Sequence, residues 1–538
     1  MTQHKSSKQI YLPIVFAFIL VLGILIGRHF MPSSGSSKGN PLLIYPQTNK
    51  LEALLNLIEE EYVDTVNRDE MEENIIPEIL KNLDPHTVYI PAKDLAKVNE
   101  ELQGNFGGIG VQFSMQNDTV MVISVISGGP SEKVGLLPGD RIVAVDDSII
   151  AGKKIATNDV MKKLRGEMGT KVKVGILRRP QKDLMDFEIT RGSIPITSVD
   201  VGYMIDNETG YIKIDRFQQT TYHEFLTALA KLKANSCKQV IIDLRGNSGG
   251  LLDVAIRLCN EFLAKKELIV YTQGKSQPRQ DVYANGAGTC QDSKVIVLID
   301  EFSASASEIF AGAIQDNDRG IVIGRRSFGK GLVQQQIPLP DGSALRLTVA
   351  RYYTPSGRCI QKPYDNGIED YYHDIYNRLE HGEFYNQDSI QQNDSLIYKT
   401  KKGRTVYGGG GVMPDIFVPR DTSMITDYFV KLRMNGIIYR YALQYSDNHR
   451  KELDQYVTAD GIKEHLDSKP IIREFLKFAK DKGVKYNVDE FNLSKQIIET
   501  EIKAYIARNI IDNEGFYPII HTIDDVLLRA MEELKEES

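Results

Sequence analysis

Residues 294–334 read KVIVLIDEFSASASEIFAGAIQDNDRGIVIGRRSFGKGLVQ and carry the strongest pattern in the chain. Five apolar residues, 295–299, precede Asp300, as expected for a strand that is buried on both faces. A Ser/Ala-rich turn, an apolar pattern of helical spacing and a second short strand, 321–323, lead to Lys330. Ser305 is therefore predicted to lie where a buried strand becomes a helix. The unpaired N–H groups of a helix N-terminus would stabilise a developing oxyanion there.

Two structural alternatives compete with a catalytic role for this stretch. Ser305 and Glu308 form the S-x-x-E pattern of a capping box, and Ser303 offers a second cap. Residues 324–330 read G-x-x-x-x-G-K, the start of a phosphate-binding loop. Gly331 replaces the Ser/Thr of that motif, and a strand pattern follows in place of a helix, which disfavours a phosphate site.

SASASEIFAGAIQD and SFGKGLVQ resemble the active-site signature of the carboxyl-terminal processing proteases, also called tail-specific proteases. The resemblance implies a serine endopeptidase that cleaves proteins near their C-termini, with Ser305 as nucleophile, Lys330 as general base and Gln334 orienting the lysine. Ser305 and Lys330 are 25 residues apart, which is the spacing of the family. The base must be neutral, and burial in an apolar site would lower the pKa of its amine. If Lys330 begins a strand, residues 330 and 334 share one face.

The segment DLRGNSGG, residues 243–250, resembles the D-L-R-x-N-P-G-G motif of the same family, with Ser248 in place of the proline. The resemblance implies an oxyanion hole made by backbone N–H groups of Gly249 or Gly250 together with that of Ala306. Glycine suits this position because no Cβ keeps the backbone away from the substrate carbonyl.

A PDZ domain of the bacterial protease type is indicated by GGIGVQF at 107–113 and LPGDRI at 137–142. By itself the glycine-rich segment would indicate only a tight turn. In a PDZ domain, backbone N–H groups of such a loop bind the terminal carboxylate of a peptide, which pairs with the edge of the sheet. The predicted peptide-binding loop consists of Gly107, Gly108, Ile109, Gly110 and Val111.

Residues 10–27 are almost wholly apolar and follow Lys5 and Lys8. A cleaved signal peptide and an uncleaved signal anchor compete for this segment. Its 18 residues are just long enough to span a bilayer, and no A-x-A cleavage site follows, so an anchor is expected. The lysines place the N-terminus in the cytoplasm. The prediction is a single-pass protein of the bacterial inner membrane with its catalytic part on the periplasmic side.

Charge and cysteine content limit the classes of ligand and partner that are expected for this protein. The net charge is −7 and no dense basic cluster occurs, which argues against binding of nucleic acid. The four cysteines form no C-x-x-C pair, so a zinc site is not indicated, while one disulfide stays open. No metal or cofactor is implied, the expected partners are protein or peptide substrates bound through their C-termini, and a homo-oligomer or adaptor is left open.

The predicted fold is mixed α/β: a crotonase-like α/β protease core with an inserted PDZ domain, an N-terminal helical region and a C-terminal helical extension. The expected parts are a cytoplasmic N-terminus (1–8), a transmembrane anchor (9–30), a linker (31–49), an N-terminal helical region (50–103), the PDZ domain (104–192), the catalytic core (193–422) and a C-terminal helical region (423–538).

Two other functions compete with the protease. One is a catalytically inactive PDZ scaffold on a protease fold, which the intact Ser305, Lys330 and Gln334 disfavour. The other is a Ser-His-Asp hydrolase, but the sequence has no G-x-S-x-G motif, and none of the nine histidines lies between residues 224 and 372.

Overall fold

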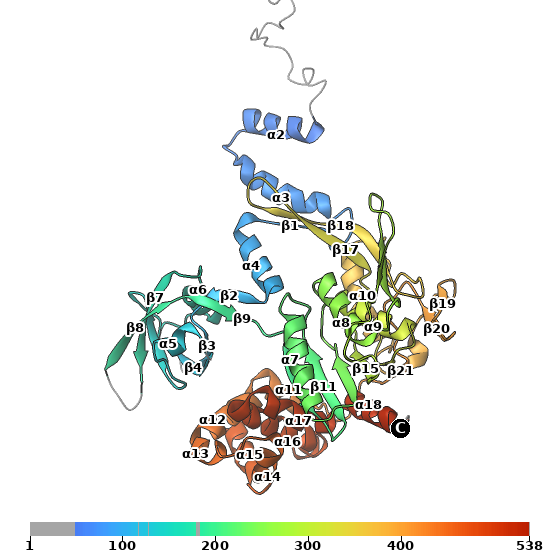
Figure 1. Ribbon diagram of the computed structural model, residues 1–538. Coiled ribbons are helices and arrows are strands. Elements are labelled where there is room, and N and C mark those ends of the chain that lie inside the picture. The colour runs from blue at the N-terminus through green and yellow to red at the C-terminus, as the bar shows by residue number, and fades with distance from the viewer. Residues whose placement is uncertain (1–48, 117, 127, 179–182, 537–538) are drawn as a thin grey trace, which may run out of the picture. The chain divides into compact units, whose positions relative to one another are not determined.

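The computed structural model describes residues 49–116, 118–126, 128–178 and 183–536 (Figure 1). The predicted cytoplasmic segment and membrane anchor lie outside these residues. Among the helices in the described ranges, none combines the length and the apolar character needed to cross a membrane. The chain divides into two units, 1–75 and 76–538. The described part of the first unit contains α2 (Lys50–Glu61) and the beginning of α3 (Arg68–Leu80).

A central sheet forms the catalytic core. Its strand order is β10-β11-β12-β15-β16-β21, in which β10 runs antiparallel to β11 and the other neighbours are parallel. The apolar run 295–299 is buried in the middle of the sheet, as its sequence predicts. The strands are β10 (Val199–Met204), β11 (Thr209–Ile214), β12 (Gln239–Asp243), β15 (Lys294–Ile299), β16 (Ile321–Gly324) and β21 (Ile416–Phe417).

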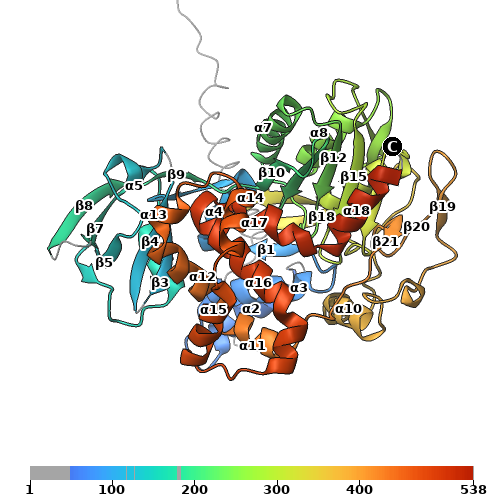
Figure 2. The same cartoon turned by 90° about the horizontal axis from the view of Figure 1, so that it is seen from below.

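Helices cover both faces of this sheet. On one face, α7 (Thr221–Ala234), α8 (Leu252–Phe262) and α9 (Ala306–Asp316) bury their apolar sides in one large core. On the other face lies α18 (Asp525–Glu536), which runs along β15 and β16 (Figure 2). The mixed α/β core predicted from the sequence is therefore present.

A second, antiparallel sheet borders the core. It has the order β1-β18-β13-β14, and β17 also pairs with β18. Its strands are β1 (Val88–Ile90), β13 (Leu268–Gln273), β14 (Gln280–Tyr283), β17 (Leu332–Pro338) and β18 (Ala344–Tyr353). The polar insertion that follows β18 is not an open loop, because it contains the helix α10 (Ile368–Glu380) and the hairpin of β19 (Ile397–Lys399) and β20 (Thr405–Tyr407).

The PDZ domain follows α4 (Ala92–Gln103) and is inserted between two strands that pair with each other, β2 (Asn105–Gly108) and β9 (Gly192–Pro195). Its sheet has the order β3-β4-β5-β7-β8 and encloses its own apolar core. The elements are β3 (Val111–Gln116), β4 (Thr119–Val125), α5 (Pro130–Lys133), β5 (Arg141–Val145), β6 (Ser148–Ile149), α6 (Thr157–Leu164), β7 (Lys171–Leu177) and β8 (Leu184–Thr190).

The C-terminal region is helical, as predicted, and has a hydrophobic core of its own. Its elements are α11 (Asp427–Met434), α12 (Ile437–Asn448), α13 (Arg450–Leu453), α14 (Ala459–Asp467), α15 (Ile471–Asp481), α16 (Val488–Ile511), α17 (Asn513–Ile520) and the 3₁₀ turn η3 (His521–Ile523), before α18. The four cysteines are all unpaired.

Candidate active site

Three loops leave the same edge of the central sheet, because β12, β15 and β16 are parallel neighbours. In open α/β sheets such an edge is the usual place for a ligand. The loops are 244–251, 300–305 and 325–331, and they border a cleft of about 320 Å³ that contains both Ser305 and Lys330. Its lining is Leu102, Ser248, Gly250, Leu251, Leu252, Ser305, Ala306, Ile309, Lys330, Leu332, Val333, Gln334, Gln336, Arg346 and Tyr352.

Ser305 differs from the two neighbouring serines in both exposure and backbone conformation. Ser303 and Ser307 are 0% exposed, whereas Ser305 is partly exposed and lines the cleft. The backbone of Ser305 has φ 55° and ψ −112°, a conformation that is costly for a residue with a Cβ. Strain of this kind is maintained at functional sites, and here it presents the hydroxyl at the start of α9.

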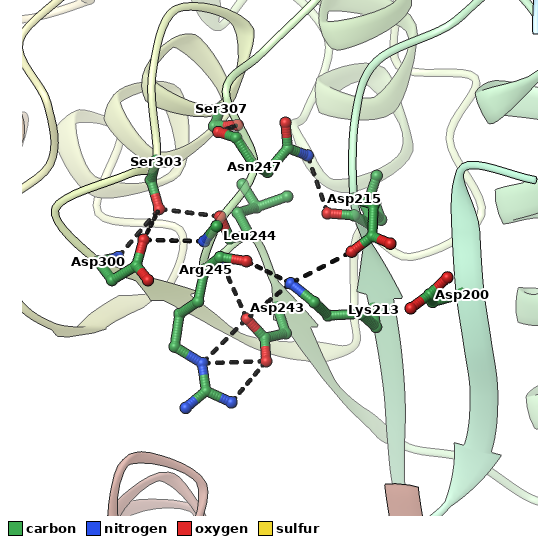
Figure 3. Close-up of polar contacts among 12 residues, drawn as sticks. Asp200, Lys213, Asp215, Asp243, Leu244, Arg245, Asn247, Asp300, Ser303 and Ser307 are labelled. Carbon is green, nitrogen blue, oxygen red and sulfur yellow. Dashed lines mark hydrogen bonds and ion pairs between the residues drawn. The ribbon is translucent and has the colours of Figure 1, made fainter. Parts of the chain in front are cut away.

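The hydroxyls of Ser303 and Ser307 position the neighbouring loop. Ser303 Oγ donates to the Leu244 carbonyl at 2.8 Å, and Ser307 Oγ donates to the Asn247 carbonyl at 2.9 Å (Figure 3). The Asn247 carbonyl also accepts from the Ala304 N–H at 2.9 Å. These bonds hold the loop after β12 against the turn that carries Ser305.

The two glycines of this loop have different roles. Gly249 N–H donates to the Asn247 side chain at 2.8 Å, so it is already used within the loop. A Cβ at Gly249 would lie 2.8 Å from that of Ser305, so only glycine fits there. Gly250 lines the cleft, and Ala306 N–H is the first of α9, where no intrahelical acceptor exists. The N–H groups of Gly250 and Ala306 are therefore better placed for the predicted oxyanion hole than that of Gly249, which is bonded within the loop.

Lys330 and Gln334 are joined as predicted, at 3.0 Å from Nζ to Oε1. The reason given from the sequence is wrong, because β17 begins at Leu332, after the lysine, and its register shifts between Val333 and Gln334. The Gln334 amide is fixed from its other end, where Nε2 donates to the His86 carbonyl at 2.5 Å. Burial, and then the charge of Arg346, lower the pKa of Lys330 to about 8.

Glu308 links Ser305 to the loop of Lys330: its bond to the Ser305 N–H is the one that the capping box predicts, and its bonds to the lysine loop are those that the pattern did not reveal. Its Oε2 accepts from the Ser305 N–H at 2.7 Å and from the Lys330 N–H at 2.9 Å. Its Oε1 accepts from Ser327 Oγ at 2.6 Å and from the Gly329 N–H at 2.7 Å. The carboxyl is completely buried among these neutral donors, and burial raises its pKa to about 7.

Two further contacts hold the loop of Lys330, and sequence reasoning missed both. Tyr352 OH is within hydrogen-bond distance of the carbonyls of Lys330 (2.6 Å) and Ser305 (3.1 Å). From α10, Arg378 donates to the carbonyls of Ser327 and Arg326, at 3.0 and 2.6 Å. In the sequence, the contact of Arg378 is indicated only by the polar insertion after β18, and that insertion does not show which distant residues it contacts.

His86 lies beside this site without contacting the lysine amine. Its Nε2 is 2.9 Å from Tyr371 OH, and its backbone N–H donates to Asp84 at 2.8 Å. Burial lowers the pKa of His86 to about 3. These contacts give His86 a structural role, and its carbonyl takes part in orienting Gln334.

A buried charge cluster lies beneath the loop after β12 (Figure 3). Asp243 is 1% exposed and pairs with Arg245 at 2.6 Å and with Lys213 at 3.7 Å. The guanidinium of Arg245 also pairs with Asp524, just before α18, at 2.7 Å. Burial alone would raise the pKa of Asp243, but the charges of Arg245 and Lys213 outweigh it and lower that pKa below its usual range.

The predicted PDZ loop is divided between two elements. Gly107 and Gly108 belong to β2 and pair with Ser193 and Gly192 of β9. Ile109 and Gly110 form the turn into β3, which begins at Val111, and Gly110 has φ +77°. The predicted peptide-binding loop therefore consists of the end of β2, the turn at 109–110 and the first residue of β3.

The sequence patterns of known families match three parts of the chain. "Peptidase family S41" matches residues 208–372, and "PDZ domain" matches residues 107–190. Residues 428–512 match a "Family of unknown function".

Characterised sequences give the same family. The carboxy-terminal-processing protease of Bartonella bacilliformis is 37% identical over 63% of this chain and 79% of that protein. The chain belongs to peptidase family S41. Within the family, the carboxy-terminal processing protease CtpB of Bacillus subtilis is 33% identical over 60% of this chain and 66% of that protein. A solved structure, the photosystem II D1 C-terminal processing protease, is 24% identical over 68% of this chain and 86% of that one, with a TM-score of 0.35.

These matches confirm the family, the PDZ domain and a serine-type peptidase of the C-terminal processing kind, as predicted from SASAS and FGKG. The catalytic roles of individual residues and the membrane anchor remain predictions.

Proposed function

We propose that this S41 peptidase cleaves proteins near their C-termini by a Ser/Lys mechanism. The observation that carries the proposal is a partly exposed Ser305, in a strained backbone conformation, in the same cleft as Lys330. In the first step Ser305 Oγ bonds to the carbonyl carbon of the scissile peptide, and its proton passes to the neutral amine of Lys330. Gln334 holds that amine in position.

The oxygen of the tetrahedral intermediate accepts hydrogen bonds from Gly250 and Ala306 N–H, which are fixed before the substrate arrives. The protonated Lys330 then gives its proton to the leaving amine, and the C–N bond breaks to leave an ester on Ser305. Water attacks this ester with Lys330 again as base, which frees the acid and restores the serine hydroxyl.

Side chains along the cleft favour an apolar substrate residue next to the scissile bond. Leu251, Leu252, Ile309 and Val333 line it, and apolar surface that they cover is removed from water.

In this proposal the PDZ domain recognises the C-terminus of the substrate. The protein itself is anchored in the membrane. The 109–111 turn offers N–H groups to a terminal carboxylate beside the edge strand β3. The apolar segment 10–27 supports an uncleaved anchor in the inner membrane, with the peptidase outside the cytoplasm.

The test of the mechanism is Ser305→Ala in the full-length protein, with peptide products identified by mass spectrometry. Cleavage is expected to be abolished while the thermal melt stays close to that of the wild type. Ser356→Ala, in the turn after β18, is the matched control and is expected to stay active. Residual cleavage by Ser305→Ala would place the nucleophile elsewhere, and a wild type that binds peptides without cutting them would favour the inactive scaffold.

Tail recognition and topology need separate tests. C-terminal amidation of a substrate peptide is expected to raise KM about ten- to a hundredfold, since charge-assisted hydrogen bonds are lost. Externally added protease is expected to digest residues 31–538 in spheroplasts, and the protein is expected to stay with membranes after an alkaline wash. A mature chain that starts near residue 30 would show that the apolar segment is a cleaved signal peptide.

A further inference from the structure

Arg346 brings a second positive charge into the cleft that holds Ser305 and Lys330. It lies on β18 directly opposite Gln336 of β17 and is half-buried. Its Nη2 donates to the Gln336 amide oxygen at 3.1 Å. The Gln336 amide is itself held, because its Nε2 donates to Asn99 Oδ1 at 3.0 Å. This pair of bonds keeps the amide oxygen turned toward the guanidinium.

Arg346 differs from most arginines of the core. In the described part of the chain, no carboxylate lies within ion-pair distance of its guanidinium. Arg319 donates instead to a set of backbone carbonyls. The others that are half-buried or buried around the catalytic loops each have an acidic partner: Arg245, Arg325, Arg326, Arg358 and Arg378.

The cleft around Arg346 is positive and mostly apolar. Lys330 and Arg346 line it, and no aspartate or glutamate among the described residues does. The acid that acts on Arg346 through space is Glu101, which is exposed and lies 3.8 Å from Arg216. Burial lowers the pKa of Arg346, which means that its charge has lost part of its hydration. A carboxylate entering the cleft would restore a favourable partner for that charge.

On the basis of the peptidase activity proposed above, we propose that Arg346 determines specificity by binding a carboxylate of the substrate close to the scissile bond. A guanidinium offers two parallel N–H groups that match the two oxygens of a carboxylate. Gln336 follows Gln334, the partner of Lys330, by two residues, or about 6.6 Å along a strand. Since one residue of an extended peptide also spans about 3.3 Å, the carboxylate belongs about two residues from the bond that Ser305 attacks.

Two parts of a substrate supply this chemistry: an Asp or Glu side chain, and the free end of a tail that is cut very close to its terminus. Both would meet Arg346 in the same way. A substrate chain has one free end, so a tail bound at Arg346 through that end is not held by the PDZ turn at the same time, whereas an Asp or Glu side chain at Arg346 leaves the end free for the PDZ turn.

The test uses one cleaved peptide with an amidated C-terminus. Gln is placed in turn at each of the three positions on either side of the scissile bond and replaced there by Glu. A second series consists of peptides that end one, two or three residues after the scissile bond. Each of them is made with a free C-terminal carboxylate and with a C-terminal amide. The kcat/KM ratio of acid over neutral peptide is measured, because changes in the basicity of Lys330 affect both peptides of a pair.

The wild type is expected to prefer the carboxylate at one position by about tenfold or more, chiefly through KM. Arg346→Gln is expected to lose this preference, and Arg346→Lys, which keeps the charge but not the planar pair of donors, to retain part of it. Arg351→Gln is the matched control, since Arg351 is an exposed arginine of the same strand that contacts Tyr364 OH at 3.1 Å. It is expected to keep the full preference.

Equal cleavage of acidic and neutral peptides by the wild type at every position would overturn the role of Arg346 and leave the peptidase mechanism intact. A preference that survives in Arg346→Gln would assign the carboxylate to another group and overturn it as well. If the wild type cleaves no peptide, the proposed function fails and the specificity role fails with it. The two series show whether a side chain or a free end is bound.

Discussion

Glu308 lies in the first turn of α9 and Asp243 is the last residue of β12, and both carboxyls are buried beside the candidate active site. Their surroundings differ. Glu308 accepts hydrogen bonds from a hydroxyl and from backbone N–H groups, and burial raises its pKa to about 7. Asp243 is equally buried but lies between Arg245 and Lys213, whose charges lower its pKa. Neutral donors only reduce the cost of burying a carboxylate, whereas cations reverse its effect on the pKa.

This difference fits the tasks of the two regions. The proposed mechanism needs Lys330 with a neutral amine, and a fully ionised carboxylate beside it would work against that by raising the pKa of the lysine. The region of Asp243 instead joins the loop after β12 to the C-terminal helices, through Arg245 and Asp524. There, ionised groups that are fully paired give a connection with a defined geometry.

The largest expected effect concerns the base. Lys330→Arg keeps the positive charge but cannot lose its proton near neutral pH, so it is expected to be as inactive as Lys330→Ala. Peptide cleavage is the measurement, with Lys362→Arg as control because Lys362 pairs with Asp374 at 2.9 Å and does not line the cleft. An active Lys330→Arg would show that position 330 supplies charge and not base chemistry.

The next prediction tests the ion pairs in the region of Asp243. Asp524→Ala leaves Arg245 with Asp243 as its remaining carboxylate, and the free energy of unfolding is expected to fall by about 3 kcal/mol. Chemical denaturation measures this loss. In a double-mutant cycle with Arg245→Met the two losses are expected to be strongly non-additive, and simple additivity would mean that the two side chains do not interact.

A smaller loss in the free energy of unfolding is expected in the region of Glu308. Glu308→Gln replaces one acceptor oxygen by an NH₂ group that faces N–H or O–H donors, at a cost of about 1–3 kcal/mol for each group left unpaired. Activity is expected to fall as well, because the same carboxylate positions Ser305 and Lys330. Unchanged kcat in a folded Glu308→Gln protein would contradict the positioning role.

The pH dependence gives the finest test of the comparison. Activity is expected to rise with pH through about 8, as Lys330 loses its proton. The folded state raises the pKa of Glu308 from 4.5 to about 7, so its contribution to stability is present below pH 4.5 and lost as pH rises through about 7.

The contribution of Asp243 to stability has the opposite pH dependence. Its pKa is lowered from 3.8, so the contribution is lost only as pH falls below that value. Denaturation of the wild type, Glu308→Gln and Asp243→Asn between pH 3 and 8 should therefore show two opposite trends. Parallel trends would mean that the two carboxyls are in similar environments.

The sequence by itself determined the family, the buried strand before Ser305, the position of Lys330 and the PDZ domain. Each of these depends on residues close together in the chain, where apolar runs, turn glycines and motif spacing are directly visible. It also predicted the contact of Lys330 with Gln334, although through a strand that in fact begins at Leu332.

Only the tertiary structure decided which N–H groups face the cleft, what Glu308 holds together and where Arg346 lies. Gly249 and Gly250 are adjacent in sequence, yet only the fold shows that the first donates to Asn247. Arg245 meets Asp524 across 279 positions. Such contacts depend on the order of strands in the sheet and on the helices packed against it, and no local pattern records which distant side chain will arrive there.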